Sequence, residues 1–507
     1  MRSLFDTPLD SIASNWWSGI DNACKQAFFI AIGVNVLAFG FEMTNLTLNH
    51  DDVWHLMIQD TILNHYLGRF GFGWLYVYTQ NHYVMPFLQL VEGILMMSAY
   101  GVVIARFWGL RKTADIALIA AIVCVFPYMA QTYSYNTSEA TYTLAHLLAA
   151  LAVVFSVRAT FKNVAIAALL YVGAFSIYQA VAANAAAIFV IWLVCQLVFA
   201  GEREAPAMKD IRRATVGALL AAIAGGLIYL ACVSTMHIEF DSSQAAETAF
   251  RLGGATHFSQ SIPAVWAGTR SFFIWPEQYF PDYLKQIQLA FLAVAGIFCV
   301  WLPARPLLKI AAVALLVLSV FTPRALQLLH PDGTFHPVTL TAYAVVIAGA
   351  LMIVVRAGRI FVRNVALVAG FVLVAGYAMQ CNWMSTVNYL NTIAHLETLT
   401  QVLARVRGVP DASWDGKRIA VVGRYDMPIG YPFKPQNAVA SRFMDAKHMD
   451  DMARLIRDEA TFVAADQTMP KVLEYARTHA PWPSPGSVAV VDGMGVVVFS
   501  KDATPAE

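Results

Sequence analysis

Charged side chains are scarce in this chain. Asp, Glu, Lys and Arg make up 13% of its 507 residues, and hydrophobic residues make up 58%; a soluble domain carries about 25% charged residues. The net charge of +1 provides no basic excess that would bind nucleic acid. The sequence also lacks a Walker-type loop, a dinucleotide fingerprint, a zinc-ligand spacing and a nucleophile elbow. The low charged and high hydrophobic fractions indicate a membrane protein, and the missing motifs give no sign of a soluble nucleotide-binding or zinc enzyme.

Cysteine is rare, and its six positions do not suggest a disulfide framework or a metal site. Cys24 and Cys381 lie near the ends of apolar blocks, far apart in the sequence. The other four lie inside apolar blocks, namely Cys124, Cys195, Cys232 and Cys299. A thiol in such a place usually serves as a small apolar side chain, so we interpret all six as structural.

Long hydrophobic blocks dominate the sequence instead. Each is long enough to cross about 30 Å of hydrocarbon as a helix. The predicted spans are 27–46, 84–107, 114–130, 140–157, 163–177, 181–200, 214–234, 287–301, 307–321, 339–355 and 360–380. The stretch before the first span holds acidic residues and the pair Trp16-Trp17, so it resembles an interfacial segment rather than a secretory signal. The sequence therefore predicts an all-α polytopic membrane protein with about eleven transmembrane helices.

The basic residues predict the orientation of these spans. One set of short loops carries Arg106, Arg111, Lys112, Arg158, Lys162, Arg203, Lys209, Arg212, Arg213, Arg305, Lys309, Arg356, Arg359 and Arg363. The opposite set is longer but carries only Arg69, Arg251, Arg270, Lys285 and Arg324. Because positive charge is retained in the cytoplasm, the first set and the N-terminus should be cytoplasmic. An odd number of spans then places the C-terminus outside, in the periplasm of a bacterial inner membrane.

Two domains are expected. The membrane domain covers residues 1–380 and includes two large external loops, 47–83 and 235–286. Residues 381–507 have an ordinary soluble composition and open with an amphipathic pattern formed by Leu390, Ile393, Leu396, Leu399, Leu403 and Val406. A strand at 418–422, helices near 452–456 and 472–475, and a hairpin around Asp492-Gly493 follow. This pattern predicts a small periplasmic α/β domain.

The sharpest candidate site is His50-Asp51-Asp52, just outside the first span. One aspartate could simply cap a helix that begins at Val53. That helix would be amphipathic and would lie flat on the membrane. A carboxylate at this depth would face a lipid-linked phosphate and could act as a general base towards an acceptor hydroxyl.

Arg69 is the second candidate, because it lies in Gly68-Arg69-Phe70-Gly71-Phe72-Gly73-Trp74 at the end of the same loop. A guanidinium can bind phosphate with two hydrogen bonds. The alternative is an arginine that reaches lipid headgroups. Arg270, Lys285 and Arg324, with His330 and Asp332 nearby, lie on the same predicted face and could converge on the phosphate.

Polar residues near the span ends complete the set. Tyr178 and Gln179 form a tight external turn, and Asn184 lies one turn inside; these side chains either bond a neighbouring helix or line a cavity. Glu139 begins the fourth span and is either a cap or a second, acceptor-side carboxylate. We interpret His146 as an interhelical hydrogen-bonding group rather than a ligand.

The order of these motifs resembles a known family. Asn49-His50-Asp51-Asp52, then Gly68-Arg69, then Ser176-Ile177-Tyr178-Gln179-Ala180 resemble the Gtr type II glucosyltransferases that modify O-antigen. That family lies within the GT-C superfamily of polyprenyl-phosphate-sugar-dependent glycosyltransferases. The resemblance covers roughly residues 25–380 and implies a GT-C-like fold for the membrane domain.

The resemblance also implies a mechanism. Asp51 or Asp52 would deprotonate a hydroxyl of a polysaccharide acceptor, which displaces the lipid phosphate of undecaprenyl-phosphate-glucose or a similar lipid-linked hexose with inversion. Arg69 and one or more of Arg270, Lys285 and Arg324 would stabilise the departing phosphate. His50, Glu139, Tyr178, Gln179 and His330 would bind substrate. A divalent Mg or Mn ion at His50, Asp51 and Asp52 is left open, and the upstream partners would be a flippase and a polyprenyl-phosphate glucosyltransferase.

Two other functions compete with this interpretation. A transporter or flippase for a lipid-linked sugar would account for the spans and the arginines, but not for the acidic pair or the folded tail. A non-catalytic scaffold of a polysaccharide-assembly complex would account for the tail. Turnover of a synthetic polyprenyl-phosphate-glucose by the purified protein distinguishes the enzyme from both.

Overall fold

Helices form most of the structure, a computed structural model that describes residues 9–48, 52, 68–80, 85–199, 208–236, 258–274, 279–301, 305–328, 336–411, 413–426 and 443–501. Each of the eleven predicted spans overlaps a described helix. These helices are α2 (Asn22–Thr44), α6 (Pro86–Phe107), α7 (Thr113–Cys124), α9 (Glu139–Ser156), α10 (Phe161–Ile177), α11 (Val181–Val198), α12 (Met208–Thr235), α15 (Asp282–Trp301), α16 (Pro306–Phe321), α17 (Ala342–Ala357) and α18 (Ile360–Arg407). Within the described residues, nine helices are long and apolar enough to cross a membrane, and α7 and α10 are shorter apolar helices.

Local sequence signals explain where several helices begin. The Asp21 carboxylate accepts a hydrogen bond from Ala23 N (3.1 Å) ahead of α2, and Thr160 Oγ1 accepts one from Asn163 N (3.3 Å) ahead of α10. Such caps satisfy backbone donors that the first turn leaves unpaired. Pro86 and Pro306 occupy the first turns of α6 and α16, where a missing N–H costs nothing.

The third predicted span, 114–130, is wrong in its second half. Helix α7 ends at Cys124, and the chain continues through the short helix α8 (Met129–Tyr133). Pro127 explains the break, since its ring cannot continue a helix and restricts the residue before it. At 1.5 Å per residue, α7 covers about 18 Å, which is less than a full bilayer core.

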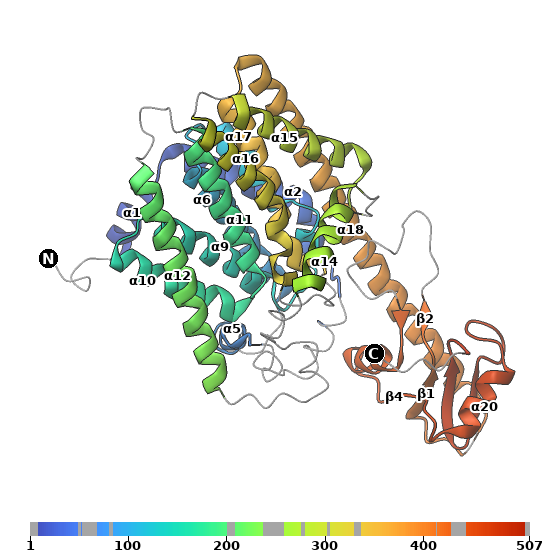
Figure 1. The fold of residues 1–507 in the computed structure, drawn as a ribbon. Coiled ribbons are helices and arrows are strands. Elements are labelled where there is room, and N and C mark those ends of the chain that lie inside the picture. Colours follow the sequence, from blue (N-terminus) through green and yellow to red (C-terminus); the bar gives the residue numbers. More distant parts are fainter. Residues whose placement is uncertain are drawn as a thin grey trace.

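The described helices pack into a bundle (Figure 1), and many large apolar side chains on its outside are exposed. Helix α17 lies in the interior: 94% of the most apolar 18-residue stretch in Pro337–Ala357 is buried inside the protein. Helix α12 lies at an edge of the bundle beside α10 and exposes Leu219, Leu220, Ile223 and Leu227. Large exposed apolar surface on a bundle helix indicates contact with lipid, so the protein is a multi-pass membrane protein.

Those predicted cytoplasmic basic residues that the structure describes lie at one end of the bundle. Arg356 Nη1 donates to Trp108 O (3.2 Å), which joins the end of α17 to the end of α6. Arg363 pairs with Asp115, which joins the start of α18 to the start of α7. We call this end, where α6, α9 and α17 end and α7, α10, α12 and α18 begin, the basic end. The opposite end, where α2 ends and α9 begins, is the acidic end.

Among the described residues before α18, further helices lie outside the predicted spans. They are α1 (Leu9–Ser18), α5 (Phe70–Gln80), α14 (Phe258–Ile274) and the 3₁₀ helix η3 (Thr322–Leu328). The sequence analysis predicted no helix at α5 or α14, because both lie in the large loops. Helix α5 packs beside α10, and α14 packs beside η3.

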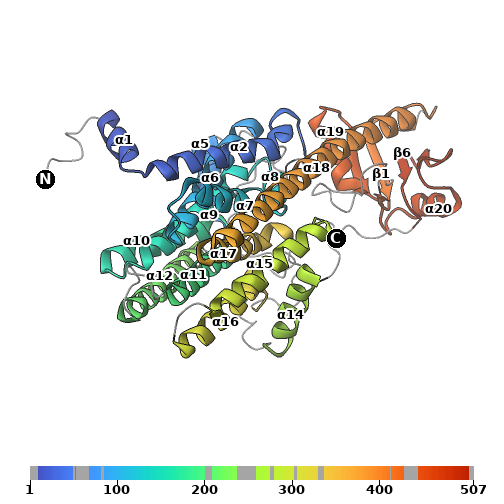
Figure 2. The ribbon, with the colours of Figure 1, turned by 90° about the horizontal axis from the view of Figure 1, so that it is seen from above.

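Helix α18 runs without interruption for 48 residues, across the predicted domain boundary at 380/381. Figure 2 shows it extending out of the bundle to the C-terminal sheet. The predicted apolar face is confirmed at Leu399, Leu403 and Val406, which are buried, but Leu390 and Ile393 are exposed. The buried face at that level is instead the polar one, with Asn388, Thr392 and His395. Thr392 on this face accepts a hydrogen bond from Leu48 N, in the segment that follows α2.

A four-stranded sheet forms the centre of the C-terminal region, in the order β4-β1-β6-β5. Strand β1 (Arg418–Val422) pairs in parallel with β4 (Thr461–Ala464) and β6 (Met494–Val498), and β5 (Val488–Val491) pairs antiparallel with β6. The predicted strand at 418–422 and the hairpin are confirmed. Asp492 (φ 56°) and Gly493 (φ 72°) form its turn, as expected for a two-residue Asp-Gly loop.

The remaining C-terminal elements surround this sheet. Helices α19 (Ala446–Leu455) and α20 (Pro470–Thr478) confirm the two predicted helical patterns, and β2 (Tyr425–Asp426) and β3 (Phe443–Met444) form a small second sheet. At the end of α18, Arg407 forms two hydrogen bonds (2.9 and 2.7 Å) with the Asp458 carboxylate. The helix therefore forms part of the core and the rim of this α/β region.

Candidate active site

The chain leaving α2 is held against α18 at the acidic end. Glu42 is buried near the end of α2; its carboxylate accepts hydrogen bonds from Thr47 Oγ1 (2.8 Å) and Ser385 Oγ (3.0 Å). Leu48 N donates to Thr392 Oγ1 (3.0 Å), and the Leu48 side chain belongs to the apolar cluster formed by α18 and the C-terminal sheet. Both the backbone and the side chain of Leu48 thereby contact α18, so the segment that leads to Asp52 starts from a fixed position.

Asp52 lies four residues further on and is completely buried. Its Oδ2 accepts a hydrogen bond from Asn136 Nδ2 (2.8 Å), and its Oδ1 accepts one from Thr137 N (3.3 Å). Asn136 Nδ2 also donates to Thr47 O (2.5 Å). The Asn136 amide thus binds both Thr47 and Asp52. These hydrogen bonds orient the carboxylate, and they come from neutral donors.

Glu139 is the third buried carboxylate at this end. It occupies the first position of α9 after Ser138, and both of its carboxylate oxygens lack a hydrogen-bond partner within the described part of the chain. It therefore does not cap the helix, which was one of the two predicted roles. Glu139 is close enough to Glu42 and Asp52 for their charges to interact.

We call Glu42, Asp52 and Glu139 the acidic cluster. Burying like charges together opposes folding, and an unpaired buried carboxylate costs more than a hydrogen-bonded one. Folding alone therefore gives no reason to retain Glu139. Unsatisfied polar groups of this kind concentrate at functional sites, where a ligand completes their hydrogen bonds.

Arg69 lies in a second, aromatic cluster at the same end of α9. Its Nη1 donates to the Tyr142 hydroxyl (2.9 Å), and its guanidinium lies 5.3 Å from the centre of the Tyr178 ring. The Tyr142 and Tyr178 rings stack at 4.4 Å. The Tyr178 hydroxyl is buried and has no hydrogen-bond partner among the described residues. We call Arg69, Tyr142 and Tyr178 the arginine cluster.

Two motifs that the sequence analysis selected separately are thus in contact. Gln179 Nε2 donates to the Tyr229 hydroxyl (2.9 Å), which in turn donates to Gly68 O (3.2 Å). The backbone before Arg69 is therefore bound to the turn at 178–179 through α12. Of the two roles predicted for Gln179, hydrogen bonding to a neighbouring helix is confirmed.

The two clusters share the first turns of α9. Glu139 and Tyr142 are three residues apart on this helix, a spacing that places side chains on the same face about 5–6 Å apart at Cβ. The unpaired carboxylate and the tyrosine that binds Arg69 therefore lie at the same depth, on the same side of α9.

Gly68 should tolerate no side chain. Its φ is +69°, and a Cβ atom there would lie 2.6 Å from the Tyr229 hydroxyl oxygen. We expect Gly68→Ala to displace Arg69, lower the melting temperature, and reduce the protein's activity about tenfold or more, because left-handed backbone costs alanine about 1 kcal/mol and the clash adds to it. Gly296→Ala is the matched control, since a Cβ at Gly296 would meet nothing within 4 Å. Equal activity in both variants would contradict the proposed role of this contact.

The other predicted cations lie on separate elements. Arg324 Nε donates to the Tyr343 hydroxyl (3.3 Å) and its Nη1 to Gln327 Oε1 (3.3 Å), and Lys285 is buried on α15. Arg270 is exposed on α14. These contacts do not bring the three side chains to Arg69, so their convergence around a phosphate stays a prediction. His50, Asp51 and His330 lie outside the described residues.

The interhelical role predicted for His146 is confirmed. Its Nδ1 is 2.7 Å from Tyr142 O and its Nε2 is 3.0 Å from Thr341 Oγ1. Asn184 joins the same network, with its Nδ2 donating to Thr341 Oγ1 (3.1 Å) and its Oδ1 accepting from Tyr100 (3.2 Å). These polar groups connect α6, α9, α11 and the start of α17 beneath the arginine cluster.

Glu42 was missed by the sequence analysis. The available signal was an acidic residue inside the first apolar span, since a charge at that depth is costly and usually marks a functional site. Ser385 and Thr392 carried no comparable signal, because hydroxyl residues are common in helices. Within the described residues, no group of three or more His, Cys, Asp or Glu side chains is arranged to hold a metal ion.

Comparison with protein-family models gives a match over most of the predicted membrane domain. The family model described as "Glucosyl transferase GtrII" matches residues 40–349. A search of curated proteins found no match. The matched region includes the acidic cluster, Arg69 and Tyr178, and ends before α18.

Proposed function

The chain belongs to the glucosyl transferase GtrII family and is a glycosyltransferase, and we propose that it transfers a hexose, glucose, from a polyprenyl-phosphate-linked donor to a periplasmic polysaccharide such as O-antigen. The observation that carries this proposal is the acidic cluster beside the arginine cluster. A carboxylate and a guanidinium at one depth suit an acceptor hydroxyl and a lipid phosphate, respectively. The family and the paired clusters favour transfer over transport or a scaffold role.

The buried carboxylate of Asp52 serves as the general base. The acceptor hydroxyl passes its proton to Asp52 while its oxygen bonds to the anomeric carbon. The bond between that carbon and the phosphate oxygen breaks at the same time, so the sugar inverts. Asn136 and Thr137 hold the carboxylate in one orientation, and such positioning lowers the cost of reaching the transition state. Asp51 is the alternative base and lies outside the described residues.

Arg69 stabilises the departing polyprenyl phosphate. Negative charge grows on the phosphate as its bond to the sugar breaks, and a fixed guanidinium stabilises it without rearrangement. Tyr142 and Tyr178 hold Arg69 in place through one hydrogen bond and the aromatic contacts. Arg270, Lys285 and Arg324 are further candidates for the lipid phosphate.

Glu139 and Tyr178 bind the sugars. Both have buried polar atoms without a protein partner in the described part of the chain. Sugar hydroxyls donate and accept hydrogen bonds, so they can satisfy a carboxylate and a phenol together. Glu139 is then the second, acceptor-side carboxylate, and Gln179 supports the turn that presents Tyr178.

The membrane orientation follows from the same proposal. The basic end faces the cytoplasm, and the acidic end faces the periplasm of a bacterial inner membrane, in line with the retention of positive charge inside. All eleven helices from α2 to the first half of α18 then cross the membrane, with α7 completing its crossing through the loop to α8. The C-terminal α/β region is periplasmic.

The decisive experiment uses the purified full chain in liposomes that contain polyprenyl-phosphate-glucose. With a polysaccharide acceptor present, we expect a product whose mass has increased by one hexose. A wild-type protein that moves the lipid-linked sugar between leaflets but forms no product would establish the transporter alternative. If the protein neither forms product nor moves the lipid-linked sugar between leaflets, the scaffold alternative is favoured.

Arg69→Lys tests the phosphate role. Lysine keeps the positive charge but loses the planar fork and the stacking on Tyr178. We expect about a tenfold lower transfer rate with the melting temperature nearly unchanged, and about a 10²-fold lower rate for Arg69→Gln. A lysine variant as inactive as the glutamine variant would mean that geometry alone matters. Full activity of both would remove Arg69 from the mechanism.

A further inference from the structure

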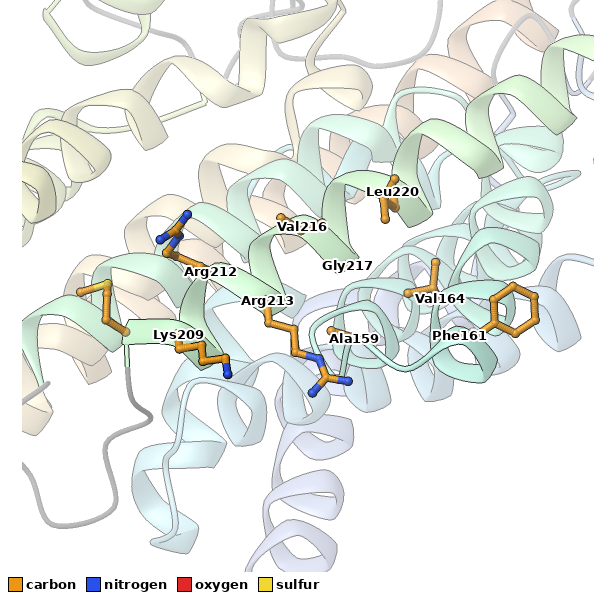
Figure 3. A pocket seen from close by; sticks show the side chains of 10 residues that line it. Ala159, Phe161, Val164, Lys209, Arg212, Arg213, Val216, Gly217 and Leu220 are labelled. Carbon is orange, nitrogen blue, oxygen red and sulfur yellow. The ribbon is translucent and has the colours of Figure 1, made fainter.

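A groove at the basic end has no part in the proposed transfer reaction. It lies between the start of α10 and the start of α12 and has a volume of about 670 Å³ (Figure 3). Gly217 allows α12 to approach its neighbours closely here, because a Cβ atom would lie 2.7 Å from Ser156 O. Helix α9 ends beside the groove and begins at Glu139, so about 27 Å separates the groove from the acidic cluster at 1.5 Å per residue.

Three cations line the groove: Lys209, Arg212 and Arg213. All three are exposed, and within the described residues none has an ion-pair or hydrogen-bond partner. Figure 3 shows Lys209 and Arg213 extending towards Ala159, with Arg212 on the other side of α12.

Other arginines at the same end are engaged by the protein. Arg356 binds Trp108 O and lies 4.0 Å from the centre of the Phe199 ring, and Arg363 pairs with Asp115. The positive charge in the groove is therefore available to a ligand.

The rest of the lining is apolar and follows the charges along α12. Val216 and Leu220 lie one and two turns beyond Arg213 and are each 55% exposed, and Phe161 opposite them is 92% exposed. Helix α12 is one of the candidate spans, so this sequence of side chains runs from the membrane surface inwards. Charge lies at the surface and apolar surface lies below it, which matches a phosphate headgroup above an acyl chain.

We propose that this groove binds an anionic phospholipid, with its phosphate at Lys209 and Arg213, Arg212 adding positive charge at the opposite edge, and one acyl chain along Val216, Leu220 and Phe161. A free phosphate would leave the apolar half of the groove unused. An acidic protein segment would have to enter the hydrocarbon to cover Leu220. The proposal is independent of the transfer mechanism, because it concerns the opposite end of the bundle.

The test measures lipid binding to the full-length protein in neutral detergent. Phosphatidylglycerol should stay bound in native mass spectra and raise the melting temperature, whereas phosphatidylcholine should do neither. The variant Lys209→Gln/Arg212→Gln/Arg213→Gln should bind phosphatidylglycerol about 10²-fold more weakly, since each basic residue near an anionic surface contributes about fivefold. The control Arg305→Gln/Lys309→Gln/Arg359→Gln removes the same charge from the same end and should bind normally.

Several outcomes would overturn the proposal. Equal loss of phosphatidylglycerol binding in both triple variants would mean that the lipid is attracted by the positive charge of the whole basic end and not by the groove. Equal binding of phosphatidylcholine, or unchanged binding by the groove variant, would remove the phosphate contact. Displacement of phosphatidylglycerol by equimolar polyprenyl phosphate would replace the proposed ligand with that lipid. If the triple variant does not fold, the single Arg213→Gln variant should still bind about fivefold more weakly, and unchanged binding by it would count against the groove.

Discussion

Asp52→Asn should lower hexose transfer by about 10²- to 10⁴-fold, the usual contribution of a general base, while the protein stays folded. Asparagine has the same shape but cannot take the proton of the acceptor hydroxyl. It also presents an N–H₂ group towards Asn136 Nδ2 or Thr137 N, both of which donate to the native carboxylate. One mismatched hydrogen bond costs about 1–3 kcal/mol, so the melting temperature should fall moderately. Activity is measured per folded protein.

Asp115→Asn is the matched control for the loss of a buried carboxylate. Asp115 is buried at the basic end, where it pairs with Arg363. We expect this variant to lose stability but to keep its activity per folded molecule. Asp51→Asn completes the set. If Asp51→Asn is inactive and Asp52→Asn transfers hexose normally, the base is Asp51 and the hydrogen bonds of Asp52 serve only to hold the loop.

Glu139→Gln should raise the melting temperature and reduce transfer about 10²-fold. The native carboxylate is fully buried, has no hydrogen-bond partner in the described part of the chain, and interacts with the charges of Glu42 and Asp52. Replacing it with an amide of the same shape removes the cost of burying an unpartnered carboxyl group, which must either stay charged in an apolar site or take up a proton. Activity falls because the acceptor loses a charge-assisted hydrogen bond. A gain in stability with a loss of function is the pattern of a residue retained for its chemistry.

Glu42→Gln is the comparison that makes this prediction specific. The Glu42 carboxylate accepts hydrogen bonds from Thr47 and Ser385, so the amide replaces satisfied charge-assisted bonds with weaker ones. We therefore expect no gain in melting temperature from Glu42→Gln. A lower melting temperature for Glu139→Gln, with activity intact, would show that Glu139 has a structural role and is not a substrate ligand.

Helix α18 connects the candidate site to the C-terminal region. Ser385 binds Glu42, Thr392 binds the backbone of Leu48, and Leu48 packs into the core that α18 forms with the sheet. The segment that leads to Asp52 begins at these anchored residues. The family match ends at residue 349, so this anchor comes from a part of the chain that the family description does not cover.

Several features of this protein depend only on local sequence and were predicted from it. An apolar block of sufficient length must satisfy its backbone hydrogen bonds internally in lipid, and only a helix does so within one segment. For this reason the predicted spans coincide with helices to within a few residues at most of their ends. The hairpin at Asp492-Gly493 is equally local, because two adjacent residues must adopt positive φ. The break after Cys124 was not predicted, because the apolar pattern continues past Pro127.

The composition of the site was decided by the tertiary structure. Asp52 meets Asn136 across 84 residues, and Glu42 meets Ser385 across 343. Such contacts depend on which helices pack together, and periodicity within one segment carries no information about that. The sequence therefore indicated that Asp52, Arg69, Glu139 and Tyr178 were candidates, because charged and polar groups are costly near a bilayer. Packing decided that Asp52 binds Asn136 near Glu139, that Arg69 binds Tyr142, and that Arg324 binds Tyr343 instead.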